Sequence, residues 1–147
     1  MNIMHVSSYY MKGLGYQENS LPKYQKKLLL EKLDGDVIFY TSERSYPFPN
    51  FERDYVHLLG RRVQKEGMDS DFGVTILRKK PLYESIKRAQ CIFNPFDIYR
   101  EIKANKINII HAHGVTNINV IFLIFISYFL GFKLFIDCHA DAINSAV

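Results

Sequence analysis

Short apolar runs of strand length alternate with helical patterns along this chain, and this alternation restricts the possible folds more than any other feature. An apolar run over 2–7 precedes a helical pattern from Glu18 to Leu33, and a second apolar run follows from Val37 to Thr41. Asp34-Gly35 between them is a typical helix end. Strand, helix and strand in this order form a βαβ unit, so we expect these two strands to be parallel.

The alternation resumes in the last third of the chain. Ile107 to Ala112 and Lys133 to Cys138 are apolar runs that predict strands. The very apolar stretch between them, Thr116 to Leu130, predicts a helix. We therefore expect a second βαβ unit here.

The middle of the chain is less regular. Ser42 to Asp71 contains two prolines, many charges and no sustained period, which predicts a long loop or an excursion with short elements of its own. Gly73 to Leu77 alternates like a strand. Ile92 to Asn105 contains a helical pattern that Asn94-Pro95 opens, because asparagine caps a helix and proline is tolerated in its first turn.

These elements predict an α/β fold, a Rossmann-like doubly wound parallel sheet formed by residues 1–147 as one domain. Hydrophobic residues make up 48% of the chain and charged residues 23%, which excludes the disordered class. A finished doubly wound domain normally carries further strands, so we expect this domain to be incomplete.

Charge and cysteine content limit the partners and the compartment. The net charge of +4 is dispersed along the chain and does not predict a nucleic-acid partner. Cys91 and Cys138 match no metal-binding spacing, and no signal peptide opens the chain, so we expect a cytoplasmic protein. The apolar run from Ile118 to Phe132 is shorter than the ~20 residues of a spanning helix and predicts a buried helix, with membrane contact as the alternative.

Peripheral contact with the inner face of the membrane is a separate hypothesis. The basic helical segment from Lys23 to Lys32 is the best candidate for a docking surface, because basic residues are attracted to anionic lipids. The alternative is a solvated charged helix face.

Ligands of open parallel sheets bind beyond the carboxyl ends of the strands, so the residues there are the first site candidates. Gly13 and Gly15 follow the first strand, where glycine lets the backbone approach a ligand and the next helix offers N–H groups to a phosphate. The third glycine of a dinucleotide fingerprint is absent. A plain turn therefore explains these glycines equally well.

The second candidate is the end of the strand before the apolar helix, which reads His111-Ala112-His113-Gly114. Alternate residues of a strand point to the same face, so His111 and His113 should share one face. For His111 we favour an ordinary half-buried histidine.

The third candidate follows the next strand. His139 lies between Asp137 and Asp141, and a neighbouring carboxylate can fix the imidazole tautomer so that the ring orients a substrate hydroxyl or phosphate. The spacing of these histidines and aspartates fits no zinc pattern, so we predict no metal site and no cofactor. Neither a G-x-S-x-G elbow nor a P-loop is present, which excludes those hydrolase classes.

In this order the motifs resemble the acceptor domain of family 4 glycosyltransferases, whose GT-B architecture places two Rossmann-like domains across a cleft. The resemblance covers nearly the whole chain. It rests on SSYYMKGLGYQE at 7–18, on YPFPN at 46–50 and LGRR at 59–62, on IIHAHG at 109–114 and on FIDCH at 135–139.

The resemblance implies a retaining transfer of a sugar from a nucleotide-sugar donor to a glycan or lipid-linked acceptor in surface polysaccharide biosynthesis. It places Gly13 and Gly15 near the donor diphosphate and His139 near the donor sugar as the catalytic candidate. It places His113 and Gly114 on the acceptor side, to which we also assign Asp137. Front-face attack needs no protein nucleophile, consistent with the lack of a glycosidase-like carboxylate pair.

The chain departs from the family in one major respect, because it contains no C-terminal donor-binding domain. The fragment alone should therefore be inactive, since the groups that stabilise the leaving diphosphate would lie in that domain. The alternative function is a non-catalytic interaction module or one subunit of a split glycosyltransferase.

Overall fold

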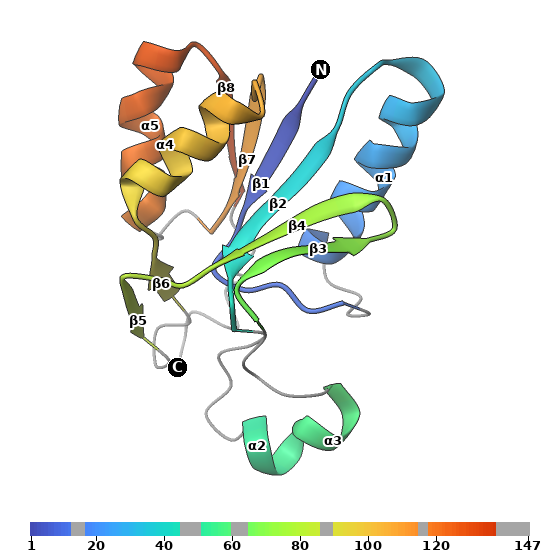
Figure 1. Ribbon diagram of the computed structural model, residues 1–147, viewed down its shortest axis with the longest axis vertical. Coiled ribbons are helices and arrows are strands. Elements are labelled where there is room, and N and C mark those ends of the chain that lie inside the picture. Colours follow the sequence, from blue (N-terminus) through green and yellow to red (C-terminus); the bar gives the residue numbers. More distant parts are fainter. Residues whose placement is uncertain (13–16, 45–50, 60–64, 86–89, 115–117, 138–147) are drawn as a thin grey trace.

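A six-stranded sheet with the strand order β3-β4-β2-β1-β7-β8 forms the centre of the molecule (Figure 1). The computed structural model describes residues 1–12, 17–44, 51–59, 65–85, 90–114 and 118–137. The sheet strands are β1 (Ile3–Val6), β2 (Val37–Ser42), β3 (Gly67–Asp71), β4 (Val74–Lys79), β7 (Ile109–His113) and β8 (Lys133–Asp137). The main helices are α1 (Gln17–Lys32), α4 (Pro95–Ala104) and α5 (Ile118–Leu130).

Five of the six strands are parallel, and only β3 runs antiparallel to its neighbour β4. Strand β1 lies in the middle, with Ile3 opposite Val37 of β2 on one side and opposite Ile109 of β7 on the other. The two expected βαβ units and their parallel strands are confirmed. The fold is Rossmann-like α/β, as predicted.

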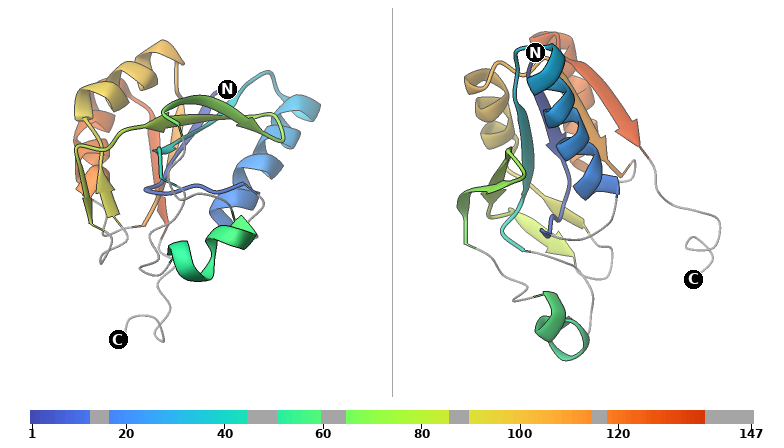
Figure 2. Two further views of the ribbon diagram at one scale, coloured as in Figure 1. Left: turned by 60° about the horizontal axis from the view of Figure 1, so that its bottom comes forward. Right: turned by 90° about the vertical axis from the view of Figure 1, so that its right-hand side faces the viewer.

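The sheet is covered on both faces, which makes it doubly wound. Helix α1 lies on one face, and α4 and α5 lie on the other (Figures 1 and 2). The larger apolar core is on the α4 and α5 face and contains Met4, Tyr40, Phe93, Ile110 and Leu123. The smaller core is on the α1 face and contains Ile3, Leu29, Val37, Phe39 and Ile76.

The chain reverses its direction of travel across the sheet between β1 and β7. From β1 the chain continues to β2, then to the edge strand β3, and then to β4, which lies between β2 and β3. It then crosses to the other side of β1, where it forms β7 and β8. This reversal creates a topological switch point between β1 and β7, the place where open α/β sheets bind ligands.

The irregular middle region contains short elements, as one of the two sequence interpretations expected. These are the helices α2 (Phe51–Asp54) and α3 (Val56–Leu59) and the edge strand β3. A separate antiparallel pair, β5 (Tyr83–Ser85) with β6 (Gln90–Ile92), follows β4 outside this region and was not predicted. Phe72 and Gly73 connect β3 to β4 with positive φ angles of 50° and 80°. β3 reads GMDSD and is mostly exposed, so it has no apolar alternation by which the sequence pattern could reveal it.

In the sequence of α1, Leu21, Tyr24 and Leu28, with either Leu29 or Lys32, recur at helical spacing and predict the apolar face, but the structure buries a partly different face. Tyr24 and Leu28 are 68% and 50% exposed, whereas Asn19, Pro22 and Leu29 are buried. Two polar neighbours on the inner side also have partners: Gln25 contacts His5, and Lys26 forms an ion pair with Asp36 at 2.8 Å. The expected apolar face was right for Leu29 and wrong for Tyr24 and Leu28, because hydrogen-bonded polar side chains can take inner positions of a helix at low cost.

The basic residues of α1 are largely neutralised by acidic neighbours. The Nζ atom of Lys23 lies 2.9 Å from Asp71, Lys26 pairs with Asp36, and Lys27 lies 3.9 Å from Glu31. Both interpretations of this helix, a membrane-docking surface and a solvated charged face, stay predictions.

Helix α5 is buried on one side only, so the expectation of a buried helix was half correct. Its inner side contains Asn119, Val120, Leu123 and Ile126. Its outer side exposes a series of apolar side chains, Ile118, Ile121, Ile124, Phe125, Tyr128 and Phe129. Among the described residues, no helix has the length and apolar character needed to cross a membrane.

Candidate functional site

Three histidines and an aspartate converge at the switch point, on the sheet face that α1 covers. His5 lies opposite His111 in the β1–β7 register, and His113 lies opposite Asp137 in the β7–β8 register. His111 and His113 share one face of β7, as the period of a strand predicts. Three adjacent parallel strands therefore bring together residues that are more than one hundred positions apart in the chain.

The two most buried histidines are joined through their rings. Nδ1 of His5 lies 2.9 Å from Nε2 of His113, and Nε2 of His5 lies 2.6 Å from Oε1 of Gln25 on α1. The ring centroids of His5 and His113 are 5.2 Å apart, and those of His111 and His113 are 4.7 Å apart. The result is a stacked group of imidazoles anchored at one end by an amide.

Asp137 anchors the other end of this group. Its Oδ2 atom lies 2.8 Å from Nε2 of His111 and 2.8 Å from Nδ1 of His113. Its backbone oxygen accepts a hydrogen bond of 3.2 Å from the backbone N–H of Gly114. Gly114 has a φ of 91°, a conformation that favours glycine, and this turn keeps the end of β7 against the end of β8.

Burial keeps two of the imidazoles neutral. It lowers the pKa of His5 from 6.5 to about 3, an effect that the hydrogen bond from His5 to Gln25 opposes and the nearby His113 reinforces. It lowers the pKa of His113 to about 4, which the negative charge of Asp137 opposes and His111 reinforces. At neutral pH each of these rings therefore has one N–H donor and one lone pair.

The predicted acceptor-side residues are found together. His113, Gly114 and Asp137 meet at the carboxyl ends of β7 and β8, and their functional roles stay predictions. His111 is partly buried, as expected, although its ring contacts Asp137. The remaining predicted residues, Gly13, Gly15, His139 and Asp141, lie outside the described residues.

The sequence interpretation missed His5, which is fully buried. It is the one ionisable residue inside the apolar first strand, and a buried ionisable group requires partners. Its position in that strand was therefore a signal, but its partners depend on the pairing of β1 with β7.

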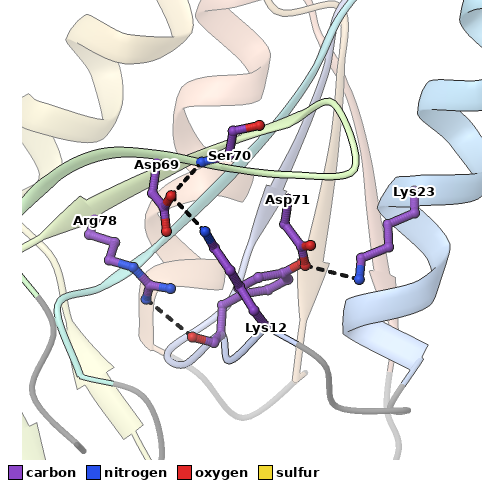
Figure 3. Close-up of polar contacts among 7 residues, drawn as sticks. Lys12, Lys23, Asp69, Ser70, Asp71 and Arg78 are labelled. Atoms are coloured by element: carbon purple, nitrogen blue, oxygen red, sulfur yellow. Dashed lines mark hydrogen bonds and ion pairs between the residues drawn. The ribbon is translucent and has the colours of Figure 1, made fainter. Parts of the chain in front are cut away.

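A second polar cluster lies further along the sheet, at β3 and β4 (Figure 3). The buried Arg78 donates hydrogen bonds to the backbone oxygens of Tyr10 and Ser42, at 3.1 and 3.3 Å. The hydroxyl of Tyr10 donates to Asp71 at 2.6 Å, and burial, reinforced by this bond, raises the pKa of Tyr10. Asp69 pairs with Lys12 at 2.7 Å. These contacts hold the segment after β1, which contains Tyr10 and Lys12, against β3 and β4. The role of this cluster is therefore structural.

The chemistry available at the switch point is that of neutral imidazoles next to a carboxylate. Such groups can accept and donate hydrogen bonds to hydroxyl groups, and His111, His113 and Asp137 also offer a set of metal-ligating atoms. Comparison of the chain with protein-family models, curated proteins and solved structures gave no match.

Proposed function

We propose that this chain is the acceptor-side domain of a retaining, sugar-nucleotide-dependent glycosyltransferase built from two facing Rossmann-like domains. The observation that supports the proposal best is the location of His113, Gly114 and Asp137 at the topological switch point of a doubly wound sheet. The family resemblance assigns His113 and Gly114 to the acceptor side, and we assign Asp137 to the same side.

The geometry suits recognition of a polyhydroxylated ligand. The side chain of Asp137 is 18% exposed and that of His111 is 17% exposed, so both are open to solvent beside the buried His113. A carboxylate and an imidazole can each pair with a sugar hydroxyl, and their fixed contacts with one another limit the reorganisation needed on binding. Sugar transfer itself would need a donor-binding domain, with the nucleotide-sugar as substrate.

Glycan binding by the chain as it stands tests this proposal. Saturation-transfer NMR with a panel of oligosaccharides should detect binding that Asp137→Asn weakens by about tenfold, as expected for loss of a charged hydrogen-bond partner. The control is His57→Ala, which removes an exposed histidine of α3, a helix that contributes no residue to the proposed site. Failure to bind any glycan would contradict the acceptor-side role.

Turnover is measured in parallel with UDP- and GDP-sugars. The chain alone should transfer no sugar, because the stabilisation of the leaving diphosphate belongs to the second domain. Robust transfer would contradict the assignment to one half of an enzyme.

The outer side of α5 favours a second candidate, a non-catalytic interaction module or a subunit of a split glycosyltransferase. The exposed Phe125 and Phe129 of α5 have ring centroids 5.2 Å apart, and the exposed Phe135 and Ile136 of β8 add apolar surface to the neighbouring edge. Apolar side chains gathered in this way mark interaction sites on soluble proteins.

A further inference from the structure

We propose that His111, His113 and Asp137 bind a divalent transition-metal ion, a property that does not depend on the proposed glycosyltransferase function. Each of the three side chains offers one ligand atom, and these atoms all lie within 4.8 Å of one another. Two imidazoles and one carboxylate are a ligand set suited to Zn²⁺, Fe²⁺ or Co²⁺.

The separations between the ligand atoms are close to those that a bound ion requires. Metal–ligand bonds of about 2.1 Å place adjacent ligands of a tetrahedral or octahedral ion about 3.0 to 3.4 Å apart. Nε2 of His111 and Nδ1 of His113 each lie 2.8 Å from Oδ2 of Asp137. A small outward movement of the carboxylate therefore creates the space for an ion.

The hydrogen-bond directions also favour a cation at this position. Oε1 of Gln25 can only accept, so Nε2 of His5 donates to it and Nδ1 of His5 carries the lone pair. That lone pair accepts from the N–H at Nε2 of His113, which leaves the lone pair of a neutral His113 on Nδ1, toward Asp137. A positive species between Nδ1 and the carboxylate, either a metal ion or a proton, makes this contact attractive.

His5 and Gln25 would then act as positioning residues. A metal-binding histidine usually donates its second ring N–H to an acceptor that fixes its tautomer and orientation, and His5 supplies that acceptor to His113. Gln25 in turn fixes the tautomer of His5 from helix α1.

The site would be open on one side. Among the described residues three protein ligands converge, and the side chains of His111 and Asp137 are 17% and 18% exposed, so water or a further ligand can complete the coordination shell. Three protein ligands with one open position are typical of catalytic zinc sites, whereas structural sites are closed by four.

Metal binding by the tag-free protein tests the proposal. Calorimetric titration with Zn²⁺ and absorption spectra with Co²⁺ are recorded for the wild type and for His111→Ala, Asp137→Asn and Gln25→Ala. The first two variants each remove a ligand at the more exposed side of the cluster, and circular dichroism checks that they remain folded. His57→Ala removes a histidine that is exposed on α3 and serves as the matched control.

We expect the wild type and His57→Ala each to bind one ion per chain with the same affinity. His111→Ala and Asp137→Asn should weaken binding by more than about tenfold, and Gln25→Ala by about tenfold through the orientation of the rings. The proposal is overturned if the wild type binds neither ion, which would assign the cation between His113 and Asp137 to a proton. It is equally overturned if both ligand variants bind as tightly as the wild type.

Discussion

Nδ1 of His5 lies 2.9 Å from Nε2 of His113, and this contact joins β1 to β7 through two side chains that are both at least 95% buried. Replacing His5 by alanine removes this bond and the bond to Gln25, and leaves His113 buried and Gln25 partly buried without them. We expect the free energy of unfolding to fall by about 2 to 4 kcal/mol, measured by urea unfolding at pH 7. His57→Ala, on the exposed surface of α3, should change it by less than about 0.5 kcal/mol. A His5→Ala protein as stable as this control would contradict the structural role of the contact.

The same two histidines predict how stability depends on pH. Their folded-state pKa values of about 3 and about 4 lie below the ordinary 6.5, so between pH 6.5 and 4 the unfolded chain binds more protons than the folded chain. Their contribution to stability is complete above pH 6.5 and is lost as the pH falls toward 4.

Urea unfolding across this range, with a chelator present, measures the effect. Each histidine should contribute a slope of about 1.4 kcal/mol per pH unit, and the His5→Ala variant should show a shallower slope than the wild type. Stability that is constant between pH 4.5 and 6 would contradict the neutral state of the buried rings.

Asn119 fastens the start of α5 to the segment after β6. Its Oδ1 atom accepts from the backbone N–H of Phe93 at 3.0 Å, and its Nδ2 atom donates to the backbone oxygen of Cys91 at 2.8 Å. Asn119→Ala would leave two buried backbone groups without these bonds, so we expect a loss of about 2 to 4 kcal/mol in thermal or urea unfolding. Ser127→Ala, which removes one exposed hydroxyl from the same helix, is the control. Equal stabilities of the two variants would refute this prediction.

Cys91 should be an unreactive thiol in the folded protein. Burial raises its pKa to about 12, so almost no thiolate exists at pH 8, and the side chain is completely inaccessible. In a Cys138→Ser background, the folded chain should react with a thiol reagent more than about a hundredfold more slowly than the chain unfolded in urea. Comparable rates in the two states would show that this part of the core opens readily.

The strands and helices that carry strong local patterns were predictable, whereas the contacts between them were not. β7, α5 and β8 each show a periodicity that is set within a few residues, and their types were predicted correctly. The common face of His111 and His113 followed from strand geometry alone.

The remaining features depend on pairings between distant segments. His5 joins the site only because β1 pairs with β7 in a register that no local pattern encodes. The inner side of α1 was predicted only in part for the same reason, since Gln25 and Lys26 are partly buried against partners from other elements. The convergence of Asp137 on two histidines likewise required the β7–β8 register.

The two edges of the sheet have opposite characters. Within the described part of the chain, β3 ends the sheet with an antiparallel, polar strand whose Asp69 and Asp71 form ion pairs with Lys12 and Lys23. β8 ends it on the other side with a parallel strand that exposes Phe135 on one face and Ile136 on the other. Polar edges resist further pairing, whereas exposed apolar edges invite it. Of these two strands β8 is therefore the one at which the sheet can be extended, and self-association at high concentration should begin there.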